Sequence, residues 1–441
     1  MANRDTLERR LEFVANLYNY LEELVDKLPD QVPQSVKSKI IELILGDREL
    51  KDLINGVKGR RAPRFILMGK TGVGKSSLVN AMFGRYMAAV SDIKIGTFGI
   101  HEYNYEIDGT KVIDILDTRG IGESIETRGN TAEEELLRAI EDFNPDAVLF
   151  LLNARDRARV NEDVDSLKDV VVKWKEKNKI GREKDINIPI IVVLNQVDQL
   201  APDMYKDPNN YPKRKLDNIQ TAVQQVRKIL EENSVTYTDI IPVSSLIDWG
   251  MSPDELANLS KSQLEALQME IDCRYNINAL IDILENTIDP KAAIGLLLAT
   301  RFQAITKKIS QKITTVFSGI AAVIATTPIP ISDVFILTAL QAILVMIIAA
   351  LSGREVSFKT AQELLVALGG AGATGYGLRV LFQQSSKLLN IVFPGSGSAV
   401  SATIAGIGTR IIGTAAIKYY IEDISIEDLN QYVKQENKNI G

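Results

Sequence analysis

The chain has 441 residues, of which 45% are apolar and 24% are charged, and its formal net charge is −6. This composition excludes wholesale disorder, and at about 100–200 residues per domain it predicts two or three domains. The single cysteine, Cys273, and the single histidine, His101, exclude an internal disulfide and a two-histidine metal centre. The acidic balance argues against nucleic acid as a partner, and the charged N-terminus without an apolar core predicts a cytoplasmic protein.

Residues 1–61 are expected to form a helical segment. Apolar residues recur there at steps of three and four, with charges between them, at Leu7, Leu11, Val14, Leu17 and Leu21. Pro29 and Pro33 interrupt this pattern, and a second amphipathic stretch covers about Ser35–Val57. We expect the pair to pack on a larger core. The alternative is a helix that lies on a membrane surface, although the mixed charges suit anionic lipid poorly.

Residues 62–289 alternate short apolar runs with helical stretches, which predicts an α/β domain. The apolar runs are Phe65–Met68, Val112–Leu116, Ala147–Leu152, Ile188–Leu194 and Ile240–Val243. The dipeptide Asp108–Gly109 is a hairpin signal between Tyr103–Ile107 and Val112–Leu116. Parallel strands joined by crossover helices, together with this hairpin, predict a mostly parallel sheet in a three-layer domain.

A glycine-rich loop follows the first strand, Arg64–Met68, and precedes a helix at Leu78–Met82. Its sequence, GKTGVGKSS from Gly69 to Ser77, has the spacing GxxxxGK[ST]. Such glycines let backbone N–H groups turn inward around phosphate oxygens, and the helix N-terminus favours an anion. We expect Lys75 to reach the β- and γ-phosphates and the Ser76 hydroxyl to ligate Mg²⁺. The expected phosphate-binding residues are Gly69, Gly72, Val73, Gly74, Lys75, Ser76 and Ser77.

Three segments at strand ends point to the rest of a nucleotide site. Asp117, in Asp117–Gly120, is positioned to hold Mg²⁺ through water, and the Gly120 N–H is expected to face the γ-phosphate. Asp198, in the sequence NQVD that begins at Asn195, can accept both guanine N1–H and N2–H₂, which adenine does not offer. Asn195 is expected to brace the phosphate loop, and Ser244 and Ser245 are expected to back the base.

In order and spacing these segments resemble the translation-factor-related GTPases over about residues 62–289. The resemblance implies Mg²⁺ as the cofactor and GTP and GDP as ligands. It also implies that Thr97 is the switch threonine that closes on Mg²⁺, with Ser91 as the alternative. Gln196 stands where the family usually has a lysine that stacks on the base. Ile121 stands where Ras-like members place the water-orienting glutamine, which is similar to the Era- and septin-like branch and implies slow hydrolysis.

Residues 290–441 are much poorer in charge. The span Ile313–Ile417 holds 8 charged residues in 105, whereas the other 336 residues hold 100, so the span must be buried in protein or in lipid. Its most apolar stretches are Ile313–Thr327 and Val334–Leu351, with Pro328–Pro330 between them. Two interpretations remain: an all-α bundle with an apolar core, or a domain that docks on or enters a membrane.

The whole layout resembles bacterial Era-like GTPases that carry a C-terminal hydrophobic domain of unknown function, and it is similar to immunity-related GTPases. That resemblance implies a homodimer or higher oligomer, a membrane lipid as a further partner, and a peripheral or partly embedded position at a membrane. We therefore expect a Mg²⁺-dependent GTPase whose nucleotide state controls self-assembly or membrane engagement of its helical domain. The alternative is a slow GTP-dependent switch or scaffold that recruits a protein partner through the apolar domain.

Overall fold

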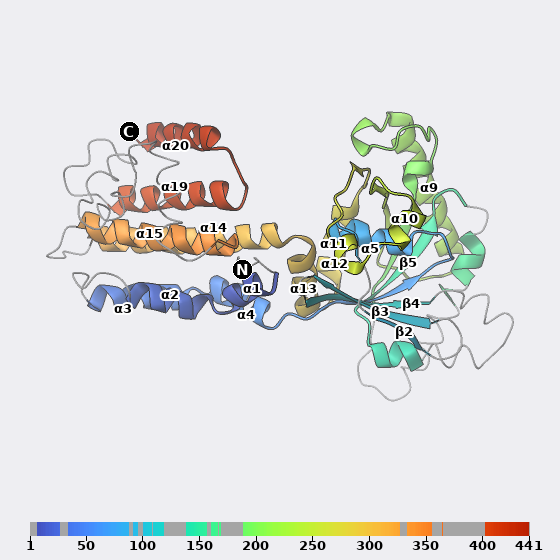
Figure 1. The fold of residues 1–441 in the computed structure, drawn as a ribbon, viewed down its shortest axis with the longest axis horizontal. Coiled ribbons are helices and arrows are strands. Elements are labelled where there is room, and N and C mark those ends of the chain that lie inside the picture. The colour runs from blue at the N-terminus through green and yellow to red at the C-terminus, as the bar shows by residue number, and fades with distance from the viewer. Residues whose placement is uncertain are drawn as a thin grey trace. The chain divides into compact units, whose positions relative to one another are not determined.

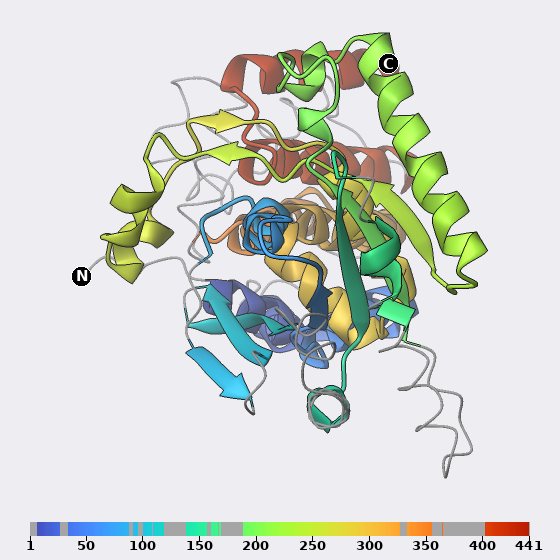
Figure 2. The ribbon, with the colours of Figure 1, turned by 90° about the vertical axis from the view of Figure 1, so that its right-hand side faces the viewer.

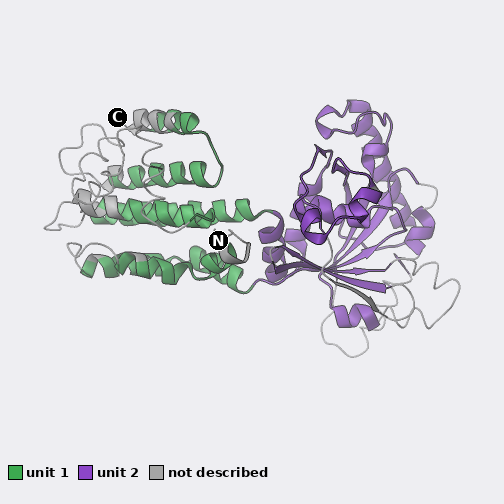
Figure 3. Cartoon of the chain, viewed as in Figure 1, with its two compact units in different colours: residues 1–59, 301–441 green, residues 60–300 purple. Residues whose placement is uncertain are grey.

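The structure, a computed structural model, separates the chain into two units. It describes residues 7–26, 34–87, 91–95, 100–107, 109–118, 138–156, 160–165, 167–168, 188–326, 333–354, 364 and 402–440. One unit is residues 60–300, and the other joins residues 1–59 to residues 301–441, as Figure 3 shows. The N-terminal helices therefore belong to the same unit as the C-terminal ones. The division of the sequence into 1–61, 62–289 and 290–441 stays a prediction.

The described part of residues 60–300 is built on a seven-stranded sheet in the order β2-β3-β4-β1-β5-β6-β7 (Figure 1). Only β2–β3 and β3–β4 are antiparallel, and the other neighbours are parallel. The strands are β1 (Arg64–Met68), β2 (Ser91–Ile95), β3 (Ile100–Ile107), β4 (Thr110–Asp117), β5 (Ala147–Asn153), β6 (Ile190–Asn195) and β7 (Asp239–Pro242). The mostly parallel sheet and the β3–β4 hairpin are confirmed. Strand β2, with the sequence SDIKI, was not predicted because it is short and carries two charges.

Both faces of this sheet are covered, which makes three layers. Ile66 and Met68 of β1, with Phe150 of β5, point into a core that includes residues 138–143 and helix α9 (Lys213–Glu232). Alternate residues of these strands point to the opposite face. There α5 (Lys75–Phe83), α12 (Ile277–Thr287) and α13 (Pro290–Thr300) pack together. Figure 2 shows α5 in blue and α9 in light green on opposite sides of the strands.

Between β7 and α12 the chain makes an excursion of small elements. It comprises β8 (Ile247–Asp248), α10 (Pro253–Ala257), α11 (Lys261–Glu265) and β9 (Ile271–Asp272). The strands β8 and β9 pair antiparallel, and reciprocal capping boxes start both helices. The excursion follows the C-terminal end of β7, and several of its residues line the pocket described below.

The second unit is entirely helical in its described part. The stretch expected over Ser35–Val57 is divided at Asp47, whose side chain accepts a hydrogen bond from Leu50 N at 2.9 Å and starts a new helix. The helices are α1 (Leu7–Ala15), α2 (Leu17–Asp26), α3 (Gln34–Gly46), α4 (Arg48–Lys58), α14 (Phe302–Thr326), α15 (Asp333–Leu351), α19 (Ala402–Tyr420) and α20 (Ile426–Ile440). α14 packs against α3, α4, α15 and α19, so the N-terminal helices cover part of the C-terminal ones.

The second half of α15 and the apolar faces of the N-terminal helices are buried in protein. Every residue from Leu340 to Leu351 of α15 is at most 9% exposed, and Leu11, Val14, Leu17 and Leu21 of the N-terminal helices are buried too. None of the helices among the described residues combines the length and the hydrophobicity that a membrane crossing requires. The turn at Pro328–Pro330 lies outside the described residues.

Candidate functional site

The glycine loop joins β1 to α5, as the sequence predicts. Gly69, Gly72 and Gly74 have positive φ angles of 145°, 80° and 93°. A Cβ at Gly69 would lie 2.6 Å from Leu151 O, and one at Gly74 would lie 2.5 Å from Asn195 Nδ2. Both positions therefore require glycine, because the loop backbone lies directly against the ends of β5 and β6. The first turn of α5 leaves the exposed Ser76 and Ser77 beside the loop.

Lys75 and Asp117 meet under this loop. Lys75 is 7% exposed, and its Nζ donates to Gly69 O at 2.6 Å and to Lys70 O at 3.4 Å. The same Nζ lies 3.6 Å from Oδ1 of Asp117, a residue 3% exposed at the end of β4. The parallel pairing of β1 and β4 sets this proximity, because Asp117 is in register with Leu67. Thr97 and Gly120 lie outside the described residues, and Ser91 is the first residue of β2.

Asn195 links the end of β6 to the glycine loop. Its side chain is fully buried, and Nδ2 donates to Val73 O at 2.9 Å. Its Oδ1 accepts from Ser245 Oγ at 3.1 Å. The neighbouring Gln196 has a positive φ of 62°, and its Nε2 donates to Gly72 O at 2.9 Å. Two adjacent side chains, more than 120 residues from the loop in the sequence, thus hold it.

Asp198 is held in place by contacts to its side chain and to its main-chain oxygen. It is 4% exposed, and its Oδ1 accepts from Ser244 Oγ at 3.0 Å. Lys206 Nζ lies 3.3 Å from its Oδ2. The fully buried Lys215 donates from Nζ to Asp198 O at 2.7 Å, to Leu200 O at 2.7 Å and to Pro202 O at 3.2 Å. The carboxylate therefore has a fixed direction.

The sequence analysis missed both lysines. Lys215 carries a signal that could have found it, since it lies on the apolar stripe of α9 with Ile219, Ala222 and Val226. A lysine on such a stripe is rarely buried unless it has partners. Lys206 lies in a loop, and nothing in its spacing from Asp198 indicates the contact. Burial lowers the pKa of Lys215, and the positive charge of Lys206 lowers it further.

Two tyrosines pack beside this group. The Tyr211 and Tyr275 rings are 5.4 Å apart, and Lys215 Nζ lies 4.9 Å from the centre of the Tyr211 ring. Burial raises the pKa of Tyr211, and the negative charge of Asp198 raises it further. The Tyr211 hydroxyl is buried and has no hydrogen-bond partner among the described residues. Tyr211 therefore contributes through its ring, by contact area and by its position beside the Lys215 ammonium.

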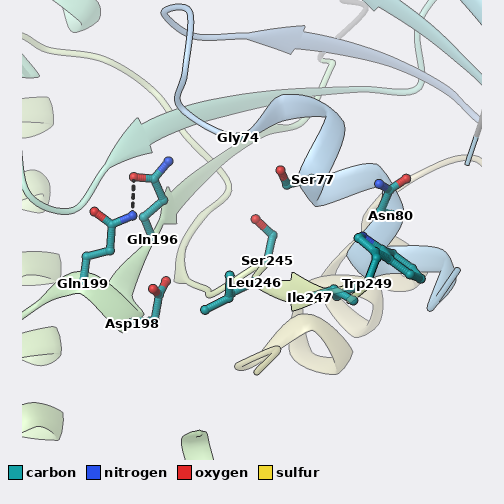
Figure 4. Close-up of a pocket in the computed structure, with 10 residues that line it drawn as sticks. All are labelled: Gly74, Ser77, Asn80, Gln196, Asp198, Gln199, Ser245, Leu246, Ile247 and Trp249. Atoms are coloured by element: carbon teal, nitrogen blue, oxygen red, sulfur yellow. Dashed lines mark hydrogen bonds between the residues drawn. The ribbon is translucent and has the colours of Figure 1, made fainter. Parts of the chain in front are cut away.

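A pocket of about 170 Å³ connects these parts. Figure 4 shows Asp198 at one end, Ser245 and Ser77 along its length, and Trp249 at the other end. The lining residues are Gly74, Ser77, Asn80, Gln196, Asp198, Gln199, Ser245, Leu246, Ile247 and Trp249. Five of them were predicted site residues. The aliphatic and aromatic wall from Leu246 to Trp249 was missed, because the sequence offered no motif for it.

The arrangement combines two recognition surfaces that line one pocket. The glycine loop and the start of α5 form the surface that suits phosphate, because the N-terminus of a helix and the Lys75 ammonium both lie there. The buried Asp198 carboxylate, at one end of the pocket, suits a ring that offers two adjacent N–H donors. Among the described residues, no group of three or more His, Cys, Asp or Glu side chains could hold a metal ion alone.

Two segments of the chain match known protein families, and the first match includes the glycine loop. Residues 64–196 match the family model of the 50S ribosome-binding GTPases, and residues 292–439 match a domain of unknown function, DUF697. The fold, the loop and the first match define the class. The chain carries a P-loop GTPase domain, the kind of enzyme that converts GTP to GDP and phosphate.

The relatives narrow the class further. The tRNA modification GTPase MnmE of Sulfurovum sp. is 32% identical over 155 residues, which are 34% of this chain and 32% of that protein. The GTPase Der of Acidithiobacillus ferrooxidans is 25% identical over 184 residues, 42% of this chain and 38% of that protein. The domain is thus a translation-factor-related P-loop GTPase, followed here by a DUF697 domain. The chain spans less than half the length of either relative.

A solved structure, described as LeoA bacterial dynamin GTPase from ETEC, is also similar to the chain. It is 13% identical, with 99% of this chain and 76% of that chain covered, at a TM-score of 0.35.

Proposed function

We propose that residues 60–300 bind GTP and GDP and hydrolyse GTP slowly, and that the bound nucleotide controls self-assembly or membrane engagement of the helical unit. The observation that carries the guanine assignment is the buried Asp198 carboxylate, which Ser244 orients at 3.0 Å. A carboxylate with a fixed direction pairs with guanine N1–H and N2–H₂, whereas adenine presents an acceptor at N1.

In this proposal the phosphates lie on the glycine loop. The backbone N–H groups of residues 69–77 would surround the phosphate oxygens, and Lys75 would turn its ammonium from Gly69 O toward the β- and γ-phosphates. Ser77 would face the α-phosphate from the first turn of α5. Asn195 and Ser245 would keep the loop and the base site at a constant separation, because Ser245 donates to the Asn195 side chain, which in turn donates to Val73 O.

The donor set of this site fits Mg²⁺. The ion prefers oxygen ligands and is usually bound through one or two carboxylates together with substrate phosphates. Ser76 supplies an exposed hydroxyl beside the loop, and Asp117 supplies a carboxylate at the end of β4. Thr97 is proposed as a further ligand and Gly120 as an N–H donor to the γ-phosphate. Bound Mg²⁺ would neutralise charge that develops between the β- and γ-phosphates.

The proposal includes slow GTP hydrolysis that assembly or a partner accelerates. The sequence has Ile121 where a water-orienting glutamine would stand, so a second copy, a lipid surface or a partner would have to complete the site. This agrees with placement near the Era- and septin-like branch, and with the layout of immunity-related GTPases. A homodimer that engages membrane lipid at the inner face of a membrane is the arrangement that we propose.

The experiment that tests this output is GTP turnover per molecule over a wide range of protein concentration, with and without anionic liposomes. We expect turnover to rise with concentration or with lipid. A flat and low rate in every condition would instead favour a switch or scaffold that recruits a protein through its apolar domain.

A paired substitution tests the site itself. Lys75→Ala should abolish nucleotide binding, because it removes the buried ammonium that the proposal turns toward the β- and γ-phosphates. Asp198→Asn should transfer preference from GTP to xanthosine triphosphate, whose additional carbonyl pairs with the new amide. Since each good polar contact to a base is worth about 1–3 kcal/mol, GTP affinity should fall about 5- to 100-fold. Unchanged GTP affinity in Asp198→Asn would overturn the guanine assignment.

A further inference from the structure

Trp249 stands at the end of the pocket away from Asp198, on the excursion that follows β7 (Figure 4). It is half-buried, and the edge of its ring system meets Tyr86, with ring centres 5.6 Å apart and planes at 71°. Asn80 of α5 lines the same end of the pocket, and its Oδ1 accepts from Met87 N at 2.9 Å. The Trp249 side chain therefore packs against Tyr86 and also lines the pocket.

Hydrogen bonds on both sides of Trp249 fix the backbone around it. Ile247 and Asp248 of β8 pair with Asp272 and Ile271 of β9, and Cys273 N donates to Leu246 O at 3.1 Å. On the other side Gly250 N donates to Asp248 Oδ1 at 2.9 Å. Gly250 has a φ of 67°, and a Cβ there would lie 2.1 Å from Glu270 Oε2. This turn fixes the direction in which the Trp249 side chain leaves the chain.

We infer that Trp249 is a nucleoside-binding residue that forms the aromatic wall against which the ribose and the adjoining purine face of the bound nucleotide pack. The inference rests on the proposed guanine nucleotide site. With the base edge at Asp198 and the α-phosphate at Ser77, the nucleoside crosses the space between them. The pocket that both residues line is also lined by Leu246 and Ile247, and it continues from Ser77 to Trp249 (Figure 4). An indole gives a large apolar surface at little cost in side-chain entropy.

The inference has a spectroscopic test, because the chain has only two tryptophans. A Trp174→Phe background leaves Trp249 as the chain's one indole. In that background, saturation with GDP should change the intensity and the wavelength of tryptophan emission. Pyrophosphate with Mg²⁺, which occupies the glycine loop without a nucleoside, should leave the emission unchanged.

Affinity measured by titration calorimetry provides the second readout. Trp249→Ala should weaken GDP binding about 5- to 100-fold, the range that alanine substitution of base-stacking aromatic residues gives. Pyrophosphate affinity should be unaffected, and Trp249→Phe should restore most of the GDP affinity. Met251→Ala is the matched control, because Met251 follows the same turn, is 41% exposed and does not line the pocket.

The outcomes separate this inference from the proposed function. If the unaltered chain binds no GDP, the proposed function fails. If it binds GDP and Trp249→Ala binds GDP equally well, the wall assignment is wrong while the function stands. Equal losses of GDP and pyrophosphate affinity would mean that Trp249 acts through the fold of the loop, and this too would overturn the inference.

Discussion

Replacing Lys215 by methionine should damage both the stability of the P-loop domain and its base site. Methionine keeps most of the side-chain volume and removes the ammonium. Lys215 is fully buried, and its Nζ contacts three main-chain oxygens, those of Asp198, Leu200 and Pro202, at 2.7, 2.7 and 3.2 Å. The substitution leaves these buried carbonyls without their donor.

The expected cost follows from two opposing contributions. Hydrogen bonds to a charged group contribute about 1.5–3 kcal/mol each, so three of them set an upper limit of about 9 kcal/mol. Burying the charged ammonium costs free energy, which offsets part of this gain, and the same desolvation lowers the pKa of Lys215. Removing one partner of a buried charged group typically costs about 3–5 kcal/mol, and we expect that range. In a domain of this size it corresponds to a fall in melting temperature of about 10 °C.

The assay is calorimetric unfolding, because two units in one chain can melt separately. Only the transition of residues 60–300 should move, and GDP affinity should fall at least tenfold, since Asp198 O is one of the lost acceptors. Lys213→Met is the control, as Lys213 is exposed in the same helical turn. Its effect should stay within about 0.5 kcal/mol. Equal melting of the two variants would refute the role of the three carbonyl contacts.

Two other predictions concern stability. Because the pKa of Tyr211 is raised in the folded chain, its contribution is complete below about pH 10 and is lost as pH rises above that value. Tyr211→Phe should reduce this alkaline loss in urea unfolding and change stability at pH 7 by less than about 1 kcal/mol, since no hydrogen bond is removed; a large loss at pH 7 would contradict it. In the helical unit, a Cβ at Gly413 would lie 2.5 Å from Thr314 Oγ1, so Gly413→Ala should destabilise by about 1–3 kcal/mol. In a Thr314→Ala background the same change should be close to neutral, and an equal loss in both backgrounds would exclude this contact as the cause.

The sequence predicted those parts of the site that depend on local backbone requirements. The glycine loop was predictable because Gly69 and Gly74 leave no room for a Cβ, a demand that appears directly as residue type. Strand ends at Asp117 and Asn195 were predictable because buried parallel strands are continuous apolar runs. Trp249, by contrast, reaches the pocket only through the pairing of β8 with β9, a contact between two-residue strands that no periodicity indicates.

The helical unit shows a different limit of sequence reasoning. The low charge of residues 313–417 was compatible with burial in protein or in lipid, because both environments select apolar side chains. In the structure, other protein segments bury residues 340–351 of α15. Inside that core, Gln341 Nε2 donates a hydrogen bond to Thr409 Oγ1 at 3.1 Å. Which helices supply the cover depends on contacts between α14 and the N-terminal helices α3 and α4, more than 240 residues apart in the chain.

Gln196 illustrates how a departure from a motif can be explained by its surroundings. From sequence, replacing the family's lysine suggests weaker stacking on the base. In the structure the amide donates to Gly72 O at 2.9 Å and accepts from Asn153 Nδ2 at 2.9 Å and Gln199 Nε2 at 3.1 Å. An ammonium could make the first contact only, because it has no acceptor. Asn153 and Gln199 both donate to the Gln196 side-chain oxygen, so they require an acceptor at this position. The amide of Gln196 therefore connects the base site to the glycine loop through hydrogen bonds that a lysine would break.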